Sequence, residues 1–232
     1  MLNPKPLPDI THPWLLVCEG FGDAEFFRHL CDVRGISGFQ IEHLTNYEKG
    51  QPSGNGGFRR YLSGIESRKG SPQAVLIVAD SDDEPDKNFE EIKKQIKKAG
   101  FAPPDNPLEV KRQSAGMVLV VMMIPINETG FSSKGCLETL LLRAVTHHLP
   151  NVHTCAEAYL QCLNTAGWSV TKIDKMKLRC IVAGFWKDDP NISLGYALKP
   201  DKGIIPLNHE CFDSVANFLG SFRNWLSSQG IR

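Results

Sequence analysis

Apolar runs divide the first part of the chain into short segments that fit buried strands. The segments 14–18 and 74–79 are apolar throughout, and each is too short for a typical helix. Such runs are typical of parallel strands covered on both faces. Alternation over 39–44 predicts another strand, and the segments 108–113 and 117–125 predict a hairpin.

Helical segments alternate with these strands. Apolar residues recur every three or four positions in four segments: 22–33, 58–68, 86–99 and 137–147. Strands and helices in alternation are typical of a sheet covered by helices on both faces. We therefore predict an α/β fold, a three-layer α/β/α domain with a mostly parallel sheet.

The pattern turns helical beyond residue 150. Three more segments have helical spacing: 154–166, 172–186 and 209–228. At about 150 residues per domain, 232 residues make one domain with a large extension, or two small domains. We expect an α/β domain over 10–150 and a helical C-terminal extension over 151–232, which either stands apart or packs on the same domain.

Composition and charge restrict the function. The chain is 41% hydrophobic, and its 26 basic residues balance 26 acidic ones, which excludes a disordered protein and disfavours one that only coats nucleic acid. The longest apolar run, 117–124, is far shorter than the roughly 20 residues needed to cross a bilayer, so we expect no membrane partner. Seven scattered cysteines and the absence of a signal peptide predict reduced thiols and a cytoplasmic location.

Acidic residues follow the predicted strands. Glu19 and Asp23 come after the first strand, Asp80 and Asp82 after the third, and Glu138 begins the helix after the hairpin. In an open parallel sheet, functional groups gather where strands end. Carboxylates held together repel each other unless a cation lies between them, and their oxygens suit Mg²⁺ or Mn²⁺. The alternative is that acids are simply common in turns after strands.

The sequence excludes three other phosphate or metal motifs. An EF-hand loop from Asp80 needs glycine where Pro85 stands, and a dinucleotide fingerprint from Gly20 needs glycine where Glu25 stands. The chain also lacks the Gly-Lys-Ser/Thr of a P-loop. The acids therefore remain the leading candidates for chemistry.

The order Glu-Gly-x-x-Asp, then Asp-x-Asp after a later strand, resembles the Toprim domain. The matching positions are Glu19, Gly20 and Asp23, followed by Asp80 and Asp82. Primases, topoisomerases, recombination proteins and the overcoming-lysogenization-defect (OLD) nucleases share this fold.

A small family of stand-alone Toprim-like proteins is similar to nearly the whole chain. The similar pieces are short, and Phe21-Gly22 before Asp23 is bulkier than that family's pattern. The other pieces are Gly56-Gly57-Phe58, Met123-Ile-Pro125, Gly135-Cys-Leu-Glu138, residues 175–183 and Leu194-Gly195-Tyr-Ala.

The resemblance implies a metal-dependent site that acts on phosphodiesters or nucleotides. It assigns Glu19 as general acid/base, and Asp80 and Asp82 as ligands of one Mg²⁺ or Mn²⁺. Asp23 and Glu138 become candidates for a second ion, because OLD nucleases use two. Two ions about 3.5–4 Å apart stabilise the attacking and leaving oxygens together.

Other residues are candidates for binding phosphate. A lysine near the end of the Toprim part would balance phosphate charge; Lys175 and Lys177 both qualify, and we take Lys177 as the catalytic candidate. Gly56 and Gly57, with Arg59, would offer backbone N–H groups and charge at a helix start. The alternative for the loop before this helix is a flexible connection.

The leading function is a Toprim-type nuclease, a metal-dependent phosphoryl-transfer enzyme on nucleic acid. The alternative is a non-catalytic module that binds metal or nucleotide and partners an ATPase in DNA repair or phage defence. Metal-dependent cleavage, lost when Glu19 or Asp80 is changed, separates the two.

Overall fold

A single sheet organises the described residues of the computed structural model, which are 8–44, 56–126, 133–186 and 189–231. Its strands lie in the order β2-β1-β3-β5-β4, and all are parallel except β4, which pairs antiparallel with β5. The strands are β1 (Trp14–Cys18), β2 (Phe39–His43), β3 (Ala74–Asp80), β4 (Lys111–Arg112) and β5 (Val118–Ile124).

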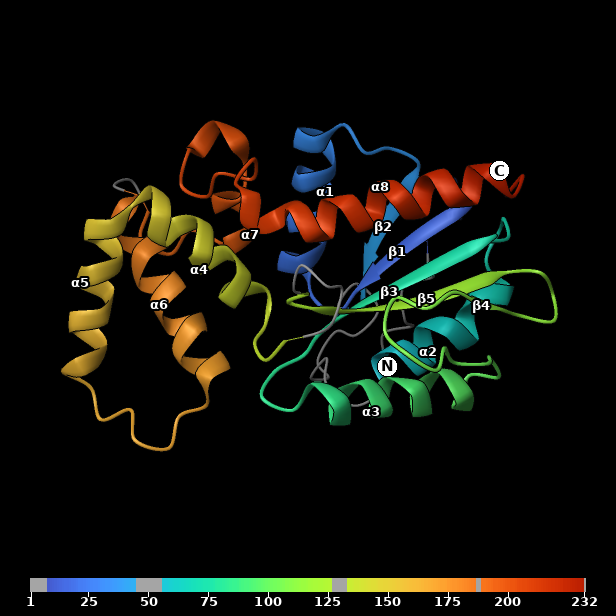
Figure 1. The fold of residues 1–232 in the computed structure, drawn as a ribbon, viewed down its shortest axis with the longest axis horizontal. Coiled ribbons are helices and arrows are strands. Elements are labelled where there is room, and N and C mark those ends of the chain that lie inside the picture. The colour runs from blue at the N-terminus through green and yellow to red at the C-terminus, as the bar shows by residue number, and fades with distance from the viewer. Residues whose placement is uncertain (1–7, 45–55, 127–132, 187–188, 232) are drawn as a thin grey trace, which may run out of the picture.

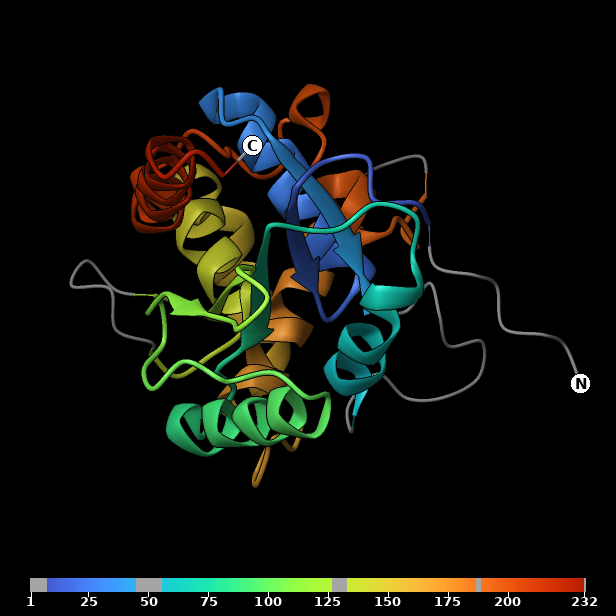
Figure 2. The same cartoon turned by 90° about the vertical axis from the view of Figure 1, so that its right-hand side faces the viewer.

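Helices cover both faces of this sheet, so the predicted three-layer α/β fold is confirmed. Helices α1 (Phe21–Arg34) and α8 (Asp213–Ser228) lie on one face. Helices α2 (Gly57–Gly64) and α3 (Pro85–Lys98) lie on the other, as Figures 1 and 2 show from two directions.

The alternation of side chains along the strands explains the continuous apolar runs. In β1, Leu16 points into the core under α1 and α8, whereas Leu15 points into the core under α2 and α3. Leu76 and Val75 divide in the same way in β3. A strand buried on both faces needs apolar residues at every position, which is the pattern seen in the sequence.

Three helices pack mainly on one another beside one end of the sheet (Figure 1): α4 (Leu137–His148), α5 (Pro150–Gln161) and α6 (Val170–Phe185). The short α7 (Leu194–Ala197) packs mainly against α1. Helix α5 begins four residues before its predicted start, because Pro150 stands at its first position, where the fixed proline φ and the missing N–H are tolerated. Short 3-10 helices complete the set: η2 (Ile65–Ser67), η3 (Pro200–Lys202) and η4 (Glu210–Phe212).

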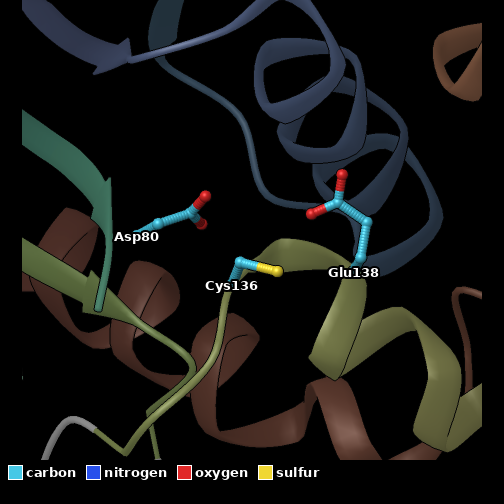
Figure 3. A group of neighbouring side chains, drawn as sticks. All are labelled: Asp80, Cys136 and Glu138. Carbon is cyan, nitrogen blue, oxygen red and sulfur yellow. The ribbon is translucent and has the colours of Figure 1, made fainter. Parts of the chain in front are cut away.

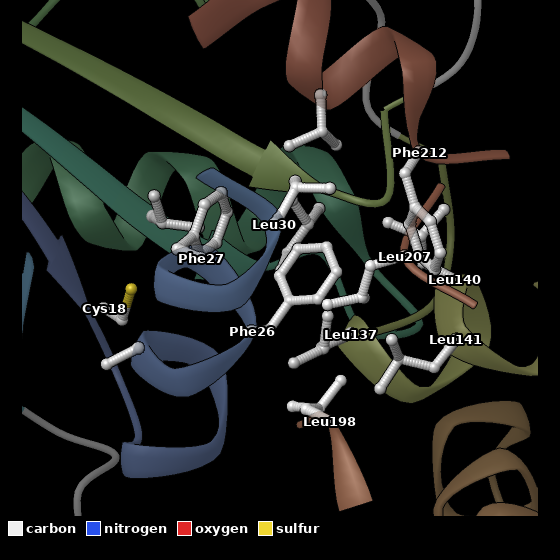
Figure 4. Packing of buried hydrophobic residues seen from close by; sticks show 14 of the residues in the cluster. Cys18, Phe26, Phe27, Leu30, Leu137, Leu140, Leu141, Leu198, Leu207 and Phe212 are labelled. Carbon is white, nitrogen blue, oxygen red and sulfur yellow. The ribbon is translucent and has the colours of Figure 1, made fainter. Parts of the chain in front are cut away.

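Residues from beyond position 150 complete the core under α1. The fully buried Phe26 packs among Leu137 of α4, Leu198, Leu207 and Phe212 (Figure 4). The rings of Phe26 and Phe212 have centroids 5.5 Å apart. The boundary near residue 150 stays a prediction, but one hydrophobic cluster contains residues from both sides of it.

Two further expectations concern the membrane and the thiols. None of the described helices combines the length and the apolar character needed to span a bilayer. The cysteines are free, and Cys18, Cys31 and Cys136 are buried. Cys18 and Cys31 serve as small apolar residues of the core, whereas Cys155 and Cys162 are exposed.

Candidate functional site

Four of the five predicted acids line one hollow at the carboxyl ends of the parallel strands. Strands β1, β3 and β5 end at the same edge of the sheet, because they pair in parallel register. Glu19, Asp23, Asp80 and Glu138 surround a hollow of about 480 Å³ there. The chain thus brings together acids that are more than a hundred positions apart in sequence.

The turn after β1 places Glu19 and Asp23. Gly20 is extended and precedes the first residue of α1, and its N–H donates to Asp23 Oδ2 over 2.9 Å. This is a capping interaction, in which a carboxylate satisfies a free N–H at a helix start. Glu19 makes no hydrogen bond or ion pair with any described residue, so its carboxylate is available to a ligand.

Asp80 connects the end of β3 to two helices. Its Oδ1 accepts a hydrogen bond of 3.0 Å from the N–H of Leu137, the first residue of α4. Its Oδ2 lies 3.7 Å from Nζ of Lys175 on α6. The free N–H groups of a helix start stabilise a carboxylate, so the position of α4 favours an ionised Asp80.

A polar contact between α4 and α6 positions Lys175. Thr139 Oγ1 donates to Asp174 Oδ2 over 2.6 Å, next to Lys175 in sequence. Ser169 caps the start of α6 by accepting from the N–H of Lys172. Helix α6 is therefore anchored at its start and to α4, and it holds Lys175 at the hollow.

Burial and mutual repulsion shift the protonation of these acids. Burial, reinforced by the charge of Asp23, raises the pKa of Asp80 to about 8 and that of Glu19 to about 7. Burial also raises the pKa of Asp23 to about 6, against the hydrogen bond from Gly20. Burial acts to lower the pKa of Lys175, but the charges of Glu138 and Asp80 outweigh it and the net shift is upward. Burial and mutual repulsion therefore favour the protonated form of these acids when no metal ion is bound.

Three of these side chains form a group that suits a metal ion. Ligand atoms of Asp80, Cys136 and Glu138 all lie within 4.8 Å of one another, and the three side chains gather at the start of α4 (Figure 3). Opposite ligands of one Mg²⁺ lie about 4.2 Å apart, twice the metal–oxygen distance. Adjacent ligands lie about 3 Å apart, so the three side chains would have to move closer together to hold one ion. A thiol beside two carboxylates favours Mn²⁺ or a softer ion over Mg²⁺.

Asp82, the predicted partner of Asp80, lies outside this group. Strand β3 ends at Asp80, and Asp82 has a φ of 48°, so the two residues do not continue one extended segment. The Asp82 carbonyl accepts from the N–H of Gly135 over 2.7 Å. Its charge still acts on the hollow, because it contributes to the raised pKa of Glu19. Glu138, expected at a second ion, takes the place beside Asp80.

The structure places Lys177 away from the acids. Its Nζ donates to Glu157 Oε1 of α5 over 3.1 Å. Residues two apart on a helix are turned by about 200°, so Lys175 and Lys177 of α6 lie on different sides of it. Of the two lysines, Lys175 is the one that lies beside the acids.

The candidate phosphate loop is also separate from the hollow. Gly56 has a φ of 99° and precedes α2, Gly57 is buried against Leu44, and Arg59 is exposed, but none of the three lines the hollow. The preceding loop, 45–55, lies outside the described residues.

Sequence reasoning did not identify several residues of the hollow. Cys136 is one of the seven scattered cysteines expected as reduced thiols, although it stands two residues before Glu138. Arg179 and Asn191 also line the hollow. Arg179 follows Lys175 by four residues, the spacing that puts two side chains on one helix face, and this signal could have found it.

Comparisons with known proteins place the chain in a family. Neither the curated proteins nor the solved structures contain a match to it. Residues 13–226 match the model of a family described as "protein of unknown function (DUF3226)". That match covers most of the 232 residues, and the chain therefore belongs to the DUF3226 family.

Proposed function

We propose that this protein is a Mg²⁺- or Mn²⁺-dependent phosphoryl-transfer enzyme that cleaves nucleic acid, a nuclease. One observation carries the proposal: four acids and a lysine line the same hollow. They are Glu19, Asp23, Asp80, Glu138 and Lys175. A cation relieves the repulsion between carboxylates gathered in this way, and metal ions held by such groups serve phosphatases, polymerases and nucleases. The resemblance of the acidic residues to those of Toprim domains points to the same chemistry.

Asp80, Cys136 and Glu138 would hold the ion. A divalent ion in such a site polarises the phosphoryl oxygens and neutralises the charge that develops on them. Asp80 is oriented for this role by the N–H of Leu137, so its free oxygen faces Lys175. Asp23 remains the candidate ligand of a second ion, although its Oδ2 already accepts from Gly20.

Glu19 is the candidate general acid/base. A pKa of about 7 lets the carboxyl group accept and return a proton near neutral pH, where proton transfer is most effective. Because no described residue hydrogen bonds to it, the group can reach a water or a leaving oxygen directly. Cations at the same hollow would offset the negative charge of the phosphate: Lys175 beside Asp80, and Arg179, which is exposed and forms no ion pair with a described residue.

The test compares cleavage by matched variants. Purified protein is incubated with plasmid and with single-stranded oligonucleotides in Mn²⁺ or Mg²⁺, beside Glu19→Gln, Asp80→Asn and the control Asp105→Asn. Asp105 is an exposed acid that does not line the hollow. We expect cleavage to fall about 100-fold or more in Glu19→Gln, since a general acid/base contributes that much, and to persist in the control.

Each outcome decides between defined alternatives. Cleavage that survives in both Glu19→Gln and Asp80→Asn contradicts the site assignment. Mn²⁺ binding without cleavage by the wild type contradicts the nuclease and favours a non-catalytic module that binds metal or nucleotide and partners an ATPase. For either function, we propose that the protein acts in the cytoplasm.

A further inference from the structure

A second hollow opens directly beside the acidic one. It has a volume of about 280 Å³ and is lined by Leu178, Val182 and Ala183 of α6 and by residues of the segment 190–194. The two hollows share residues on their common border: Glu138, Arg179, Asn191, Ile192 and Leu194. A ligand that enters one hollow therefore meets the entrance of the other.

The two hollows differ in chemistry. Acids dominate the first, whereas aliphatic side chains and Pro190 provide most of the wall of the second. Arg179 stands on the border without an ion pair among the described residues. A ligand that satisfies this arrangement carries an anionic group, which meets Arg179 and a metal ion at the acids, joined to a flat or apolar group.

We propose that the second hollow binds an unpaired nucleobase next to the phosphate that the acidic hollow takes. The inference rests on the proposed function, since it names the part of the substrate beside the reacting phosphate. Pockets for whole drug-sized ligands begin at about 300 Å³, so about 280 Å³ suits a single ring system. In a nucleotide, one sugar separates base and phosphate, which matches two hollows that share a border.

The shape of the hollow selects against duplex substrates. A base in a duplex is stacked on both faces, and it enters a concave site only after leaving the stack, which costs free energy. Residues of α6 and of the segment 190–194 both line this hollow. We therefore expect single nucleotides, single strands and frayed ends to bind better than the interior of a duplex.

Calorimetry on the full chain tests this inference separately from cleavage. The probes are adenosine 5′-monophosphate and ribose 5-phosphate, each titrated in the presence of Mn²⁺; the second lacks only the base. We expect the nucleotide to bind at least about tenfold more tightly. Ala183→Leu fills the hollow and should remove most of that difference, while leaving the affinity for Mn²⁺ unchanged.

Two more variants serve as a control and as an independent test. Gly184→Leu adds the same side chain at the next position, where nothing lies within 4 Å, and should leave the difference intact. Ile192→Ala removes part of the wall without filling the hollow, and it should weaken nucleotide binding. This variant still tests the proposal if Ala183→Leu does not fold.

If the two probes bind with equal affinity, the base site is wrong even if cleavage is confirmed. It is also wrong if neither Ala183→Leu nor Ile192→Ala changes the affinity for the nucleotide. A difference between the probes that Ala183→Leu removes supports the base site even if the protein cleaves nothing. The two proposals can therefore fail independently.

Discussion

The carboxylate of Asp80 lies where three elements meet: the end of β3, the start of α4 and the middle of α6. Some of its neighbours favour the ionised form of the carboxyl group, and others favour the protonated form. The N–H of Leu137 and the ammonium of Lys175 favour the ionised form, but burial and the nearby acids outweigh them and raise its pKa to about 8. An ionised Asp80 in this environment lowers the free energy of unfolding of the metal-free protein. Such a loss of stability is common at functional sites.

The raised pKa values predict how the stability of the metal-free protein depends on pH. Between about pH 4 and pH 8 the folded state binds more protons than the unfolded state, so the free energy of unfolding falls as pH rises through this window. Asp80→Asn removes one of these groups and keeps an oxygen for the N–H of Leu137. At pH 8 in EDTA, urea denaturation should show it to be about 1–2 kcal/mol more stable than wild type, with a shallower pH dependence.

Asp105→Asn is the control: this exposed carboxylate pairs with Lys111, which lowers its pKa, so its loss should change the pH dependence only slightly and in the direction opposite to the loss of Asp80. An Asp80→Asn variant less stable than wild type at pH 8 without metal would mean that the acids do not repel one another as described. Added Mn²⁺ should reverse the order, because it binds the folded wild type and binds the variant weakly.

At the scale of elements, the turn into α4 determines the geometry of the metal group. Gly135 has a φ of 128°, and a Cβ there would lie 2.6 Å from Thr139 Oγ1. The N–H of Gly135 also donates to the carbonyl of Asp82, which ties this turn to the end of β3. Cys136 and Glu138 follow at once, so any shift of the turn moves two of the three metal ligands.

Gly135→Ala should therefore lower both stability and metal affinity. We expect a loss of about 1–3 kcal/mol from backbone strain and crowding against Thr139, and a drop in Mn²⁺ affinity of at least about tenfold. Thermal unfolding and calorimetry measure the two effects. Gly116→Ala is the matched control: its φ is 85°, but nothing lies within 4 Å of the added Cβ.

The control should show strain alone, a smaller loss of stability with unchanged Mn²⁺ affinity. If Gly135→Ala also binds Mn²⁺ as wild type does, the turn does not position the ligands.

For the whole molecule, the helices beyond residue 150 are part of the core and part of the site. Phe26 of α1 is covered by Leu198, Leu207 and Phe212 (Figure 4), and Lys175 reaches Asp80 from α6. The sheet with α1 alone would expose this face to water. Both the fold and the hollow thus depend on contacts between the two parts of the chain.

A chain that ends at residue 150 should therefore fail to fold cooperatively. We expect no sharp thermal transition and strong binding of a hydrophobic dye, both of which spectroscopy measures. In the full chain, Phe212→Ala should cost about 3–5 kcal/mol, the usual loss for a large buried aromatic residue. Cooperative unfolding of the shortened chain would show that residues 10–150 are a domain of their own.

The sequence was most informative where one physical requirement controls the pattern. Strands β1 and β3 are buried on both faces, so their apolar runs predicted them directly. Helix α7 has four residues, too few to show a helical period, and it was not predicted. The positions of Glu19 and Asp80 followed from strand ends, because a parallel sheet brings these together.

The remaining parts of the site depend on tertiary packing. Lys175 and Lys177 differ only in the side of α6 they occupy, and the docking of α6 on α4 decides which one meets the acids. Asp82 follows the Asp-x-Asp pattern, but its positive φ turns the chain away from the extended form that would align it with Asp80. Cys136 becomes a ligand candidate only because α4 begins beside β3.

Anomalous diffraction from crystals soaked in Mn²⁺, recorded at the manganese edge, tests the central claim most directly. The account predicts a peak among Asp80, Cys136 and Glu138, in the hollow that Glu19 also lines, and its loss in Asp80→Asn crystals. A wild-type crystal with no peak there, or with manganese bound only elsewhere on the molecule, would contradict it.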